Sequence, residues 1–171
     1  MATAIGLLLA RLIFGLAFAA HGSQKLFGWF GGHGIRGTAG FFEQIGLRAP
    51  LAMATLAGLG EFVGGLLLAL GWLGPVGPAI IISVMVVAAV TVHLHNGFLA
   101  QNNGYEMPLL YAAGALAFAF AGFGGISLDA VAPIPVLDQP AVAWILIAIG
   151  VVGGLVVSAT RRAPQAGHQR A

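Results

Sequence analysis

Five long apolar segments dominate the sequence and restrict the chain to a fold that crosses a membrane. They cover residues 2–20, 51–73, 76–94, 107–123 and 141–158. About 20 apolar residues in a helix, each rising 1.5 Å, cross the roughly 30 Å hydrocarbon core of a bilayer. Charged residues make up only 7% of the chain, against roughly 25% in a soluble domain, so water is a poor solvent for its surface. The sequence therefore predicts an all-α, polytopic transmembrane helical bundle.

Residues 21–50 form the longest connection and are expected to lie at the membrane interface. Four glycines between residues 28 and 34 surround Trp29 and Phe30, which indicates a turn. A short amphipathic segment is then predicted over residues 38–46. Aromatic rings are enriched at headgroup depth, so this hairpin is predicted to anchor there. Residues 127–140, with three prolines and two aspartates, are expected to form an ordered loop.

Basic residues gather on one side of the predicted bundle. If five helices alternate in direction, the first loop, the third loop and the C-terminal tail share that side. It carries Lys25, Arg36, Arg48, Arg161, Arg162 and Arg170. The other side carries Asp129 and Asp138 and neither Lys nor Arg. The positive-inside rule then predicts an external N-terminus and a cytoplasmic C-terminus.

The sequence argues against several functional classes. The seven Lys and Arg residues form no basic stripe with interleaved aromatics, so no nucleic-acid partner is expected. The chain has no Cys, so it cannot carry a cysteine-ligated cluster or exchange disulfides by itself. No nucleophile elbow, phosphate-binding loop or nicotinamide fingerprint is present. Whether the protein is an enzyme is left open.

Two charged residues fall inside predicted spans and become the first site candidates. Arg11 lies near the middle of the first span and Glu61 near the middle of the second. Because an isolated charge at that depth costs several kcal/mol, we expect the two to pair. Such a pair could serve only to fix helix register, or it could line a polar pocket for a quinone, a proton or a small solute.

A second set of candidates lies at the cytoplasmic ends of the predicted helices: His21, Lys25, His93 and Glu106. A metal site built from His21, His93 and Glu106 is conceivable, but no HxxxH or ExxH spacing supports it, and no metal is predicted. These groups could border the polar opening of a pocket. They could equally hydrogen-bond loop backbone and headgroups.

A set of residues in order and at matching spacing makes the chain resemble the DoxX family of bacterial membrane proteins. The first part is Arg11 and Gly15, then His21, Gly22, Lys25, Leu26, Gly28, Trp29, Phe30, Gly31 and Gly32. The second part is Ala57, Gly58, Glu61, Gly64, Gly65, Leu68 and Gly71. The third part is Val92, His93, Asn96, Gly97, Phe98, Gly104, Tyr105, Glu106, Pro108, Ser127, Leu128 and Asp129.

The resemblance implies a four-helix core with an additional fifth span in this chain. On this basis residues 1–130 are predicted to be a DoxX-like membrane domain. Residues 131–160 are a loop and an additional transmembrane helix, and residues 161–171 are a cytoplasmic tail. One departure is Phe123 between Gly122 and Gly124, where the family commonly has a Gly-Pro-Gly turn.

For function, the resemblance implies an accessory or quinone-interacting subunit of a respiratory or sulfur-oxidising oxidoreductase complex in the bacterial inner membrane. The candidate pocket comprises Arg11, Glu61, His21, Lys25, His93 and Glu106. No covalently bound cofactor is expected, and the expected partners are the lipid bilayer, redox proteins and a quinone. Two alternatives remain, a binding or transport protein for a small or lipidic solute and a structural subunit of a larger assembly.

Overall fold

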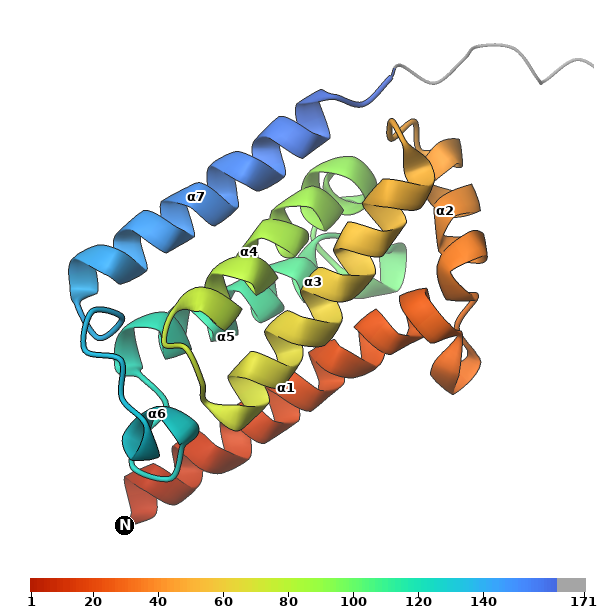
Figure 1. Ribbon diagram of the computed structural model, residues 1–171. Coiled ribbons are helices and arrows are strands. Elements are labelled where there is room, and N and C mark those ends of the chain that lie inside the picture. The colour runs from red at the N-terminus through yellow and green to blue at the C-terminus, as the bar shows by residue number, and fades with distance from the viewer. Residues whose placement is uncertain (163–171) are drawn as a thin grey trace, which may run out of the picture.

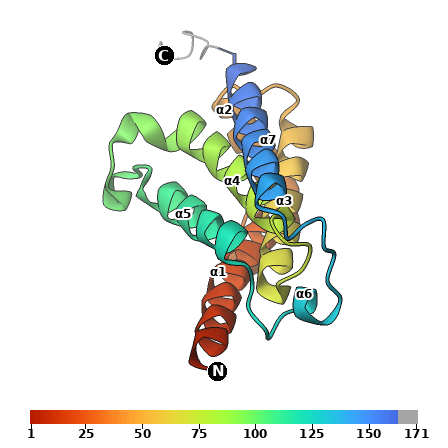
Figure 2. The same cartoon turned by 90° about the vertical axis from the view of Figure 1, so that its left-hand side faces the viewer.

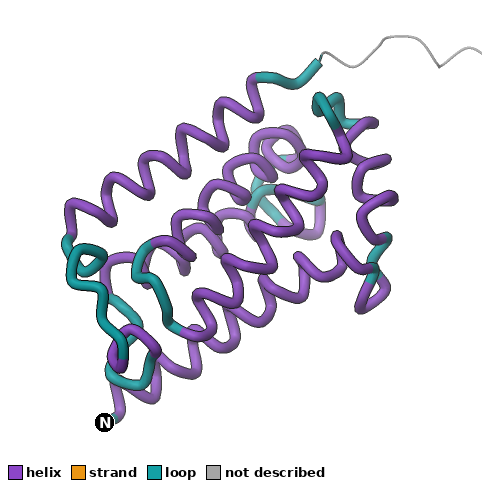
Figure 3. Tube along the Cα trace, viewed as in Figure 1, coloured by secondary structure: helices purple, strands orange, loops and turns teal. Residues whose placement is uncertain are grey.

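The computed structural model describes residues 1–162, and these fold into a bundle of helices without strands (Figures 1 and 3). The longer helices are α1 (Ala2–Phe27), α3 (Pro50–Leu70), α4 (Val76–Ala88), α5 (Glu106–Ala121) and α7 (Pro140–Ala159). The shorter ones are α2 (Gly34–Gln44) and α6 (Leu128–Val131). The predicted all-α fold is thus confirmed. Arg170 and most of the predicted tail lie outside the described residues.

Helix ends follow local sequence signals. Pro50 and Pro140 occupy the first turn of α3 and α7, where the missing N–H costs nothing. Gly28 and Gly71 end α1 and α3 in the left-handed conformation, which glycine adopts without steric penalty. α4 continues through a π-helical turn at Ala89–His93 and a 3₁₀ turn at Leu94–Asn96.

Among residues 1–162, four helices are long and apolar enough to cross a membrane. They are α1, α3, the continuous helix Val76–Asn96 and α7. α5 is equally apolar but has 16 residues, a length of about 24 Å that falls short of the roughly 30 Å hydrocarbon core. The fourth predicted span, residues 107–123, is therefore present as a shorter helix. It packs beside α4 within the bundle (Figure 2).

The helices alternate in direction and create two ends (Figure 1). The N-terminal end holds Met1, the α3–α4 turn and residues 122–139. The hairpin end holds residues 28–49, the connector 97–105 and the end of α7. The start of α1 and the end of α7 therefore lie at opposite ends of the bundle, as the predicted topology requires.

The closest helix contact in the bundle joins α1 and α3, which run antiparallel. Gly15 packs on the backbone of Gly65 and Ala69, and Gly22 packs on the backbone of Gly58 and Phe62. A β-carbon on Gly15 would lie 2.5 Å from the Ala69 nitrogen, which no real structure tolerates. Gly15 and Gly22 are seven residues apart, as are Gly58 and Gly65, so each pair lies on one helix face. These glycines fix the register.

The outer surface of the bundle is apolar, as a lipid solvent requires. Large exposed side chains include Ile13, Leu56, Trp144, Ile149 and Val152. The buried core between the helices contains Phe18, Leu68, Ile81 and Phe118. With apolar residues both inside and outside, the chain is an integral membrane protein with helices that span the bilayer.

α7 packs on α4 through two glycines and is attached at the hairpin end by backbone. Gly150 lies against the Ala79 carbonyl and Gly154 against the Ser83 carbonyl. At the end of the helix, the Arg162 N–H donates to the Gly46 carbonyl at 2.8 Å. α7 therefore touches both the α4 side of the bundle and the α2–α3 loop.

The α1–α3 contact can be tested with two glycine substitutions in the same helix. We expect Gly15→Ala to lower the free energy of unfolding by about 1–3 kcal/mol, the usual cost of overpacking. Gly6 has no atom within 4 Å of an added β-carbon. Gly6→Ala should leave stability unchanged or raise it by up to about 1 kcal/mol. Equal stabilities of the two variants in a detergent unfolding titration would contradict the proposed register.

Candidate functional site

The central polar contact of the bundle is an ion pair between α1 and α3. Lys25 Nζ lies 2.5 Å from Glu61 Oε2, and the two side chains are 28% and 5% exposed. Lys25 is in the last turn of α1, so its charge approaches Glu61 from the hairpin end. Within residues 1–162 no other ion pair is formed.

The predicted pairing of Arg11 with Glu61 is wrong, and helix register explains why. Because Gly15 lies against Gly65 and Ala69, Arg11 reaches Gly71, one turn nearer the N-terminal end. Glu61 instead lies opposite the stretch around Gly22, and Lys25 is the basic residue within reach. Arg11 and Glu61 are thus about ten residues of α3 apart in depth, roughly 15 Å, and the expectation of similar depth is also wrong.

Two aromatic rings extend the Lys25–Glu61 pair towards α5. His21 lies one helical turn before Lys25 on α1, and its ring meets Tyr111 edge-on at a centroid distance of 6.0 Å and 90°. We call His21, Lys25, Glu61 and Tyr111 the polar cluster. It combines a cation, an anion, an imidazole and a phenol from three helices.

An apolar groove between α1 and α5 leads to this polar cluster. Its volume is about 180 Å³, and it is lined by Ile13, Phe14, Ala17, Met107, Leu110 and Tyr111. Tyr111 is the only lining residue with a polar group, and it belongs to both features. Gly114 gives the ring of Phe14 room, because a β-carbon there would collide with it. We call this feature the α1–α5 groove.

Arg11 occupies a separate position at the N-terminal end. It is only 3% exposed, and its Nη2 donates to the Ile126 carbonyl. Its Nε and Nη1 have no hydrogen-bond partner among the described residues. Asp129 attracts the guanidinium electrostatically. Arg11 therefore connects α1 to the loop after α5.

Asp129 holds the α3–α4 turn in place. Its carboxylate accepts hydrogen bonds from the N–H groups of Leu73 at 2.9 Å and Gly74 at 2.8 Å. Leu73 has a positive φ, which is strained for a residue with a side chain, so the turn depends on these acceptors. Ser127 caps α6 by accepting from the Ala130 N–H at 3.2 Å. The Ser-Leu-Asp element of the sequence is therefore a structural connection between loops.

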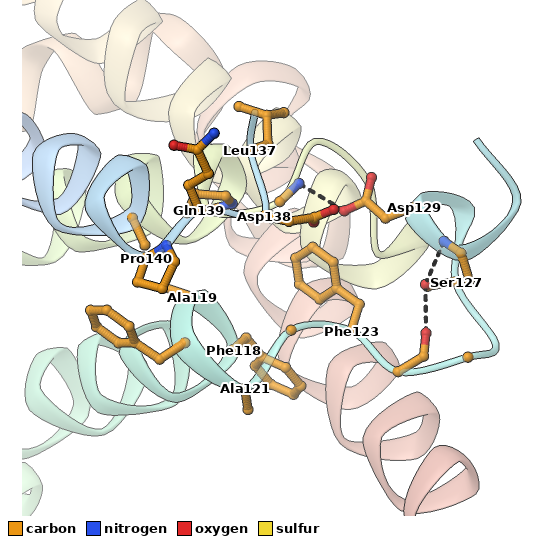
Figure 4. A pocket seen from close by; sticks show the side chains of 18 residues that line it. Phe118, Ala119, Ala121, Phe123, Ser127, Asp129, Leu137, Asp138, Gln139 and Pro140 are labelled. Atoms are coloured by element: carbon orange, nitrogen blue, oxygen red, sulfur yellow. Dashed lines mark hydrogen bonds between the residues drawn. The ribbon is translucent and has the colours of Figure 1, made fainter. Parts of the chain in front are cut away.

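A larger pocket lies beside this connection at the N-terminal end (Figure 4). Its volume is about 440 Å³. Phe118 and Phe123 form an apolar side, and Asp129, Asp138 and Gln139 form a polar side (Figure 4). We call it the N-terminal pocket. No residue of the polar cluster lines it.

The remaining candidates, His93 and Glu106, form hydrogen bonds with backbone groups of the connector. His93 Nδ1 lies 2.8 Å from the Asn103 carbonyl. Glu106 Oε2 accepts a hydrogen bond from the Ala100 N–H at 2.8 Å. The six predicted residues thus separate into three places, and only His21, Lys25 and Glu61 come together. In the described part of the chain, no three His, Asp or Glu side chains are arranged to hold a metal ion.

Tyr111 is the polar-cluster residue that sequence analysis missed. A signal was available, because Tyr111 is the only polar side chain in residues 107–121. A phenol in an apolar span needs a partner or a polar surface. Its position on the α1 face of α5, however, follows from helix packing that a single sequence does not specify.

Comparison with known proteins gives one match. The family model described as DoxX matches residues 6–94, slightly more than half of the chain. The matched segment contains Arg11, His21, Lys25, Glu61 and His93 and ends before α5. No curated protein and no solved structure matches the chain.

The buried ion pair predicts different effects for two glutamates. Glu61→Gln should lower the free energy of unfolding by about 1–3 kcal/mol, because it leaves the Lys25 ammonium without its counter-charge. Glu43 is exposed and forms no ion pair, so Glu43→Gln should change stability by less than about 0.5 kcal/mol. Unfolding in mixed detergent micelles measures both. Equal effects would exclude a stabilising Lys25–Glu61 pair.

Proposed function

Since the chain belongs to the DoxX family of membrane proteins, we propose that it binds the ring of a quinone in the α1–α5 groove. In this proposal it serves as an accessory subunit of a membrane oxidoreductase. The observation that carries the proposal is the position of Tyr111. This side chain lines an apolar groove and at the same time contacts His21 of the polar cluster.

The size of the groove supports a ring-shaped ligand. A cavity of about 150 Å³ accepts a benzene ring, and the groove volume is about 180 Å³. One substituted ring fits this space, whereas a complete lipid does not. Ile13 and Leu110 line the groove and are more than half exposed on the outer surface. An isoprenoid tail attached to the ring would leave along this apolar surface into the acyl chains.

The polar cluster supplies the groups that a quinone head requires. A quinone carbonyl accepts hydrogen bonds, and the Tyr111 phenol and the His21 imidazole are donors of that kind. His21 is exposed, and an imidazole can donate a hydrogen bond from one ring nitrogen and accept one at the other. Lys25 and Glu61 would keep this end of the groove polar. A quinone held here supplies two-electron redox chemistry, and this chain supplies binding, orientation and access to protons.

A partner protein follows from the same proposal. Because the chain has no Cys, it offers neither a dithiol nor cysteine ligands for a cluster that could pass electrons to the ring. We propose that the electrons come from a redox partner in the bacterial inner membrane. The family match extends the membrane assignment to this chain but carries no partner.

A small solute is the second candidate ligand, favoured by the N-terminal pocket. Its volume of about 440 Å³ lies in the usual range for small-molecule sites of about 300–1,000 Å³. Asp129 and Asp138 suit a solute with hydrogen-bond donors or a positive charge. This pocket lies at the other end of the bundle, so the two candidate functions use different residues.

We also propose that the hairpin end faces the cytoplasm. In the described chain this end carries Lys25, Arg36, Arg48, Arg161 and Arg162. Asp129 and Asp138 lie at the N-terminal end. The distribution follows the positive-inside rule. The polar cluster would then open towards cytoplasmic protons.

The orientation can be measured by cysteine labelling, since the chain has no native Cys. A membrane-impermeant maleimide should label Asp138→Cys in intact cells. It should label Gln44→Cys only after the cells are permeabilised. Both positions are exposed. The opposite pattern would reverse the proposed orientation.

The quinone site predicts a difference between the two tyrosines of the chain. Tyr111→Phe keeps the ring and removes the hydroxyl. We expect the amount of co-purifying quinone to fall about fivefold to tenfold, as for one lost hydrogen bond of about 1 kcal/mol. Tyr105 packs on Phe98 in the connector, so Tyr105→Phe should retain the wild-type amount. Quinone is quantified by extraction from protein purified in mild detergent.

A photoreactive quinone distinguishes the two candidate sites. Cross-links to peptides containing Ile13 or Leu110 support the α1–α5 groove. Cross-links confined to residues 118–140 would place the ligand in the N-terminal pocket and contradict the proposal. Absence of bound quinone in the wild-type protein, together with no cross-link, would also contradict it.

A further inference from the structure

Three arginines belong to the segments that come together where the end of α7 reaches the α2–α3 loop. The backbone hydrogen bond from Arg162 to Gly46 brings the end of α7 to the α2–α3 loop. Arg48 follows Gly46 by two residues. Arg161 Nη1 donates to the Thr91 carbonyl at 2.9 Å, which places it beside the π-helical turn of α4. We call Arg48, Arg161 and Arg162 the arginine corner.

Among residues 1–162, no carboxylate forms an ion pair with the arginine corner. The nearest carboxylate along the chain is Glu43, at the end of α2, and no arginine forms an ion pair with it among residues 1–162. Arg48 and Arg162 are exposed. The guanidinium groups therefore remain available to an anion from outside the chain.

Apolar side chains continue from the corner along the helices that meet there. Leu51, in the first turn of α3, is 56% exposed. Leu155 and Val156, in the last turns of α7, are 49% and 58% exposed. Because α3 begins and α7 ends here, the arginines lie where the spans reach the membrane surface. A ligand that matches both the arginine corner and the apolar side chains beside it has an anionic head and apolar chains.

We propose that the arginine corner binds the phosphate of an anionic phospholipid, with its acyl chains on the exposed faces of α3 and α7. Arginine suits this role because its guanidinium donates two parallel hydrogen bonds to phosphate oxygens. Basic side chains next to membrane spans attract anionic headgroups. The lipid would strengthen the attachment at the end of α7, where the polar connections are the Arg162–Gly46 and Arg161–Thr91 hydrogen bonds. This site is independent of the α1–α5 groove.

Native mass spectrometry of the full chain in mild detergent tests this proposal. Phosphatidylglycerol and phosphatidylcholine with the same acyl chains are added in turn. We expect the wild-type protein to retain phosphatidylglycerol preferentially. Arg48→Gln and Arg162→Gln should each weaken its retention about fivefold, the effect of one basic residue at a membrane surface. Arg48→Lys, which keeps the charge, should weaken phosphatidylglycerol retention less than Arg48→Gln does.

Arg36→Gln is the matched control, because Arg36 is an exposed arginine on α2 outside the corner. It should bind phosphatidylglycerol like the wild type. An equal loss in Arg36→Gln would overturn the proposal, since it would indicate only a general effect of net charge. Unchanged retention in both corner variants would overturn it as well. Retention of phosphatidylcholine equal to that of phosphatidylglycerol would also overturn the proposal. Displacement of the lipid by equimolar inorganic phosphate would overturn it too.

Discussion

Close packing of α1 on α3 determines where every charged group in the bundle lies. Four glycines allow the two backbones to touch, and a side chain at Gly15 or Gly22 would collide with the backbone of α3. In a membrane, where apolar burial gives little drive for helix association, such backbone proximity supplies much of the packing energy. Once this register is fixed, Glu61 can reach Lys25, and Arg11 cannot reach Glu61. The glycines thus position charges that they never contact.

The two charged positions of the α1–α3 pair therefore have different roles. Glu61 and Lys25 pair between α3 and α1, and His21 on α1 contacts Tyr111 of α5, which lines a groove that opens to lipid. Arg11 faces the loop after α5 and bonds its backbone. The first arrangement leaves polar groups beside a space that a ligand can enter. The second joins a helix to a loop that Asp129 already ties to the α3–α4 turn.

The sequence predicted the helices well because hydrophobic length and Pro or Gly signals are local. The least accurately predicted span is α5, whose length is also closest to the minimum needed to cross a bilayer. The candidate site was predicted less well. That Glu61 is buried followed from its position in an apolar run, but its partner depended on register. That register is indicated by the spacing of seven residues that Gly15 and Gly22 share with Gly58 and Gly65. A hydropathy analysis does not take glycine spacing into account. Tyr111 required the placement of α5 against α1, and this is a property of the whole bundle.

The bond from Arg11 to Ile126 also constrains how the chain is made. The two residues are 115 positions apart, and synthesis proceeds from the N-terminus. During the production of α3, α4 and α5, the guanidinium of the first helix has no access to its final acceptor. An unpaired arginine within a span opposes insertion, by about 2.5–3.5 kcal/mol at the bilayer centre. The nascent chain must therefore keep Arg11 near water or headgroups until the loop after α5 emerges. Final seating of the first helix is a late event in biogenesis.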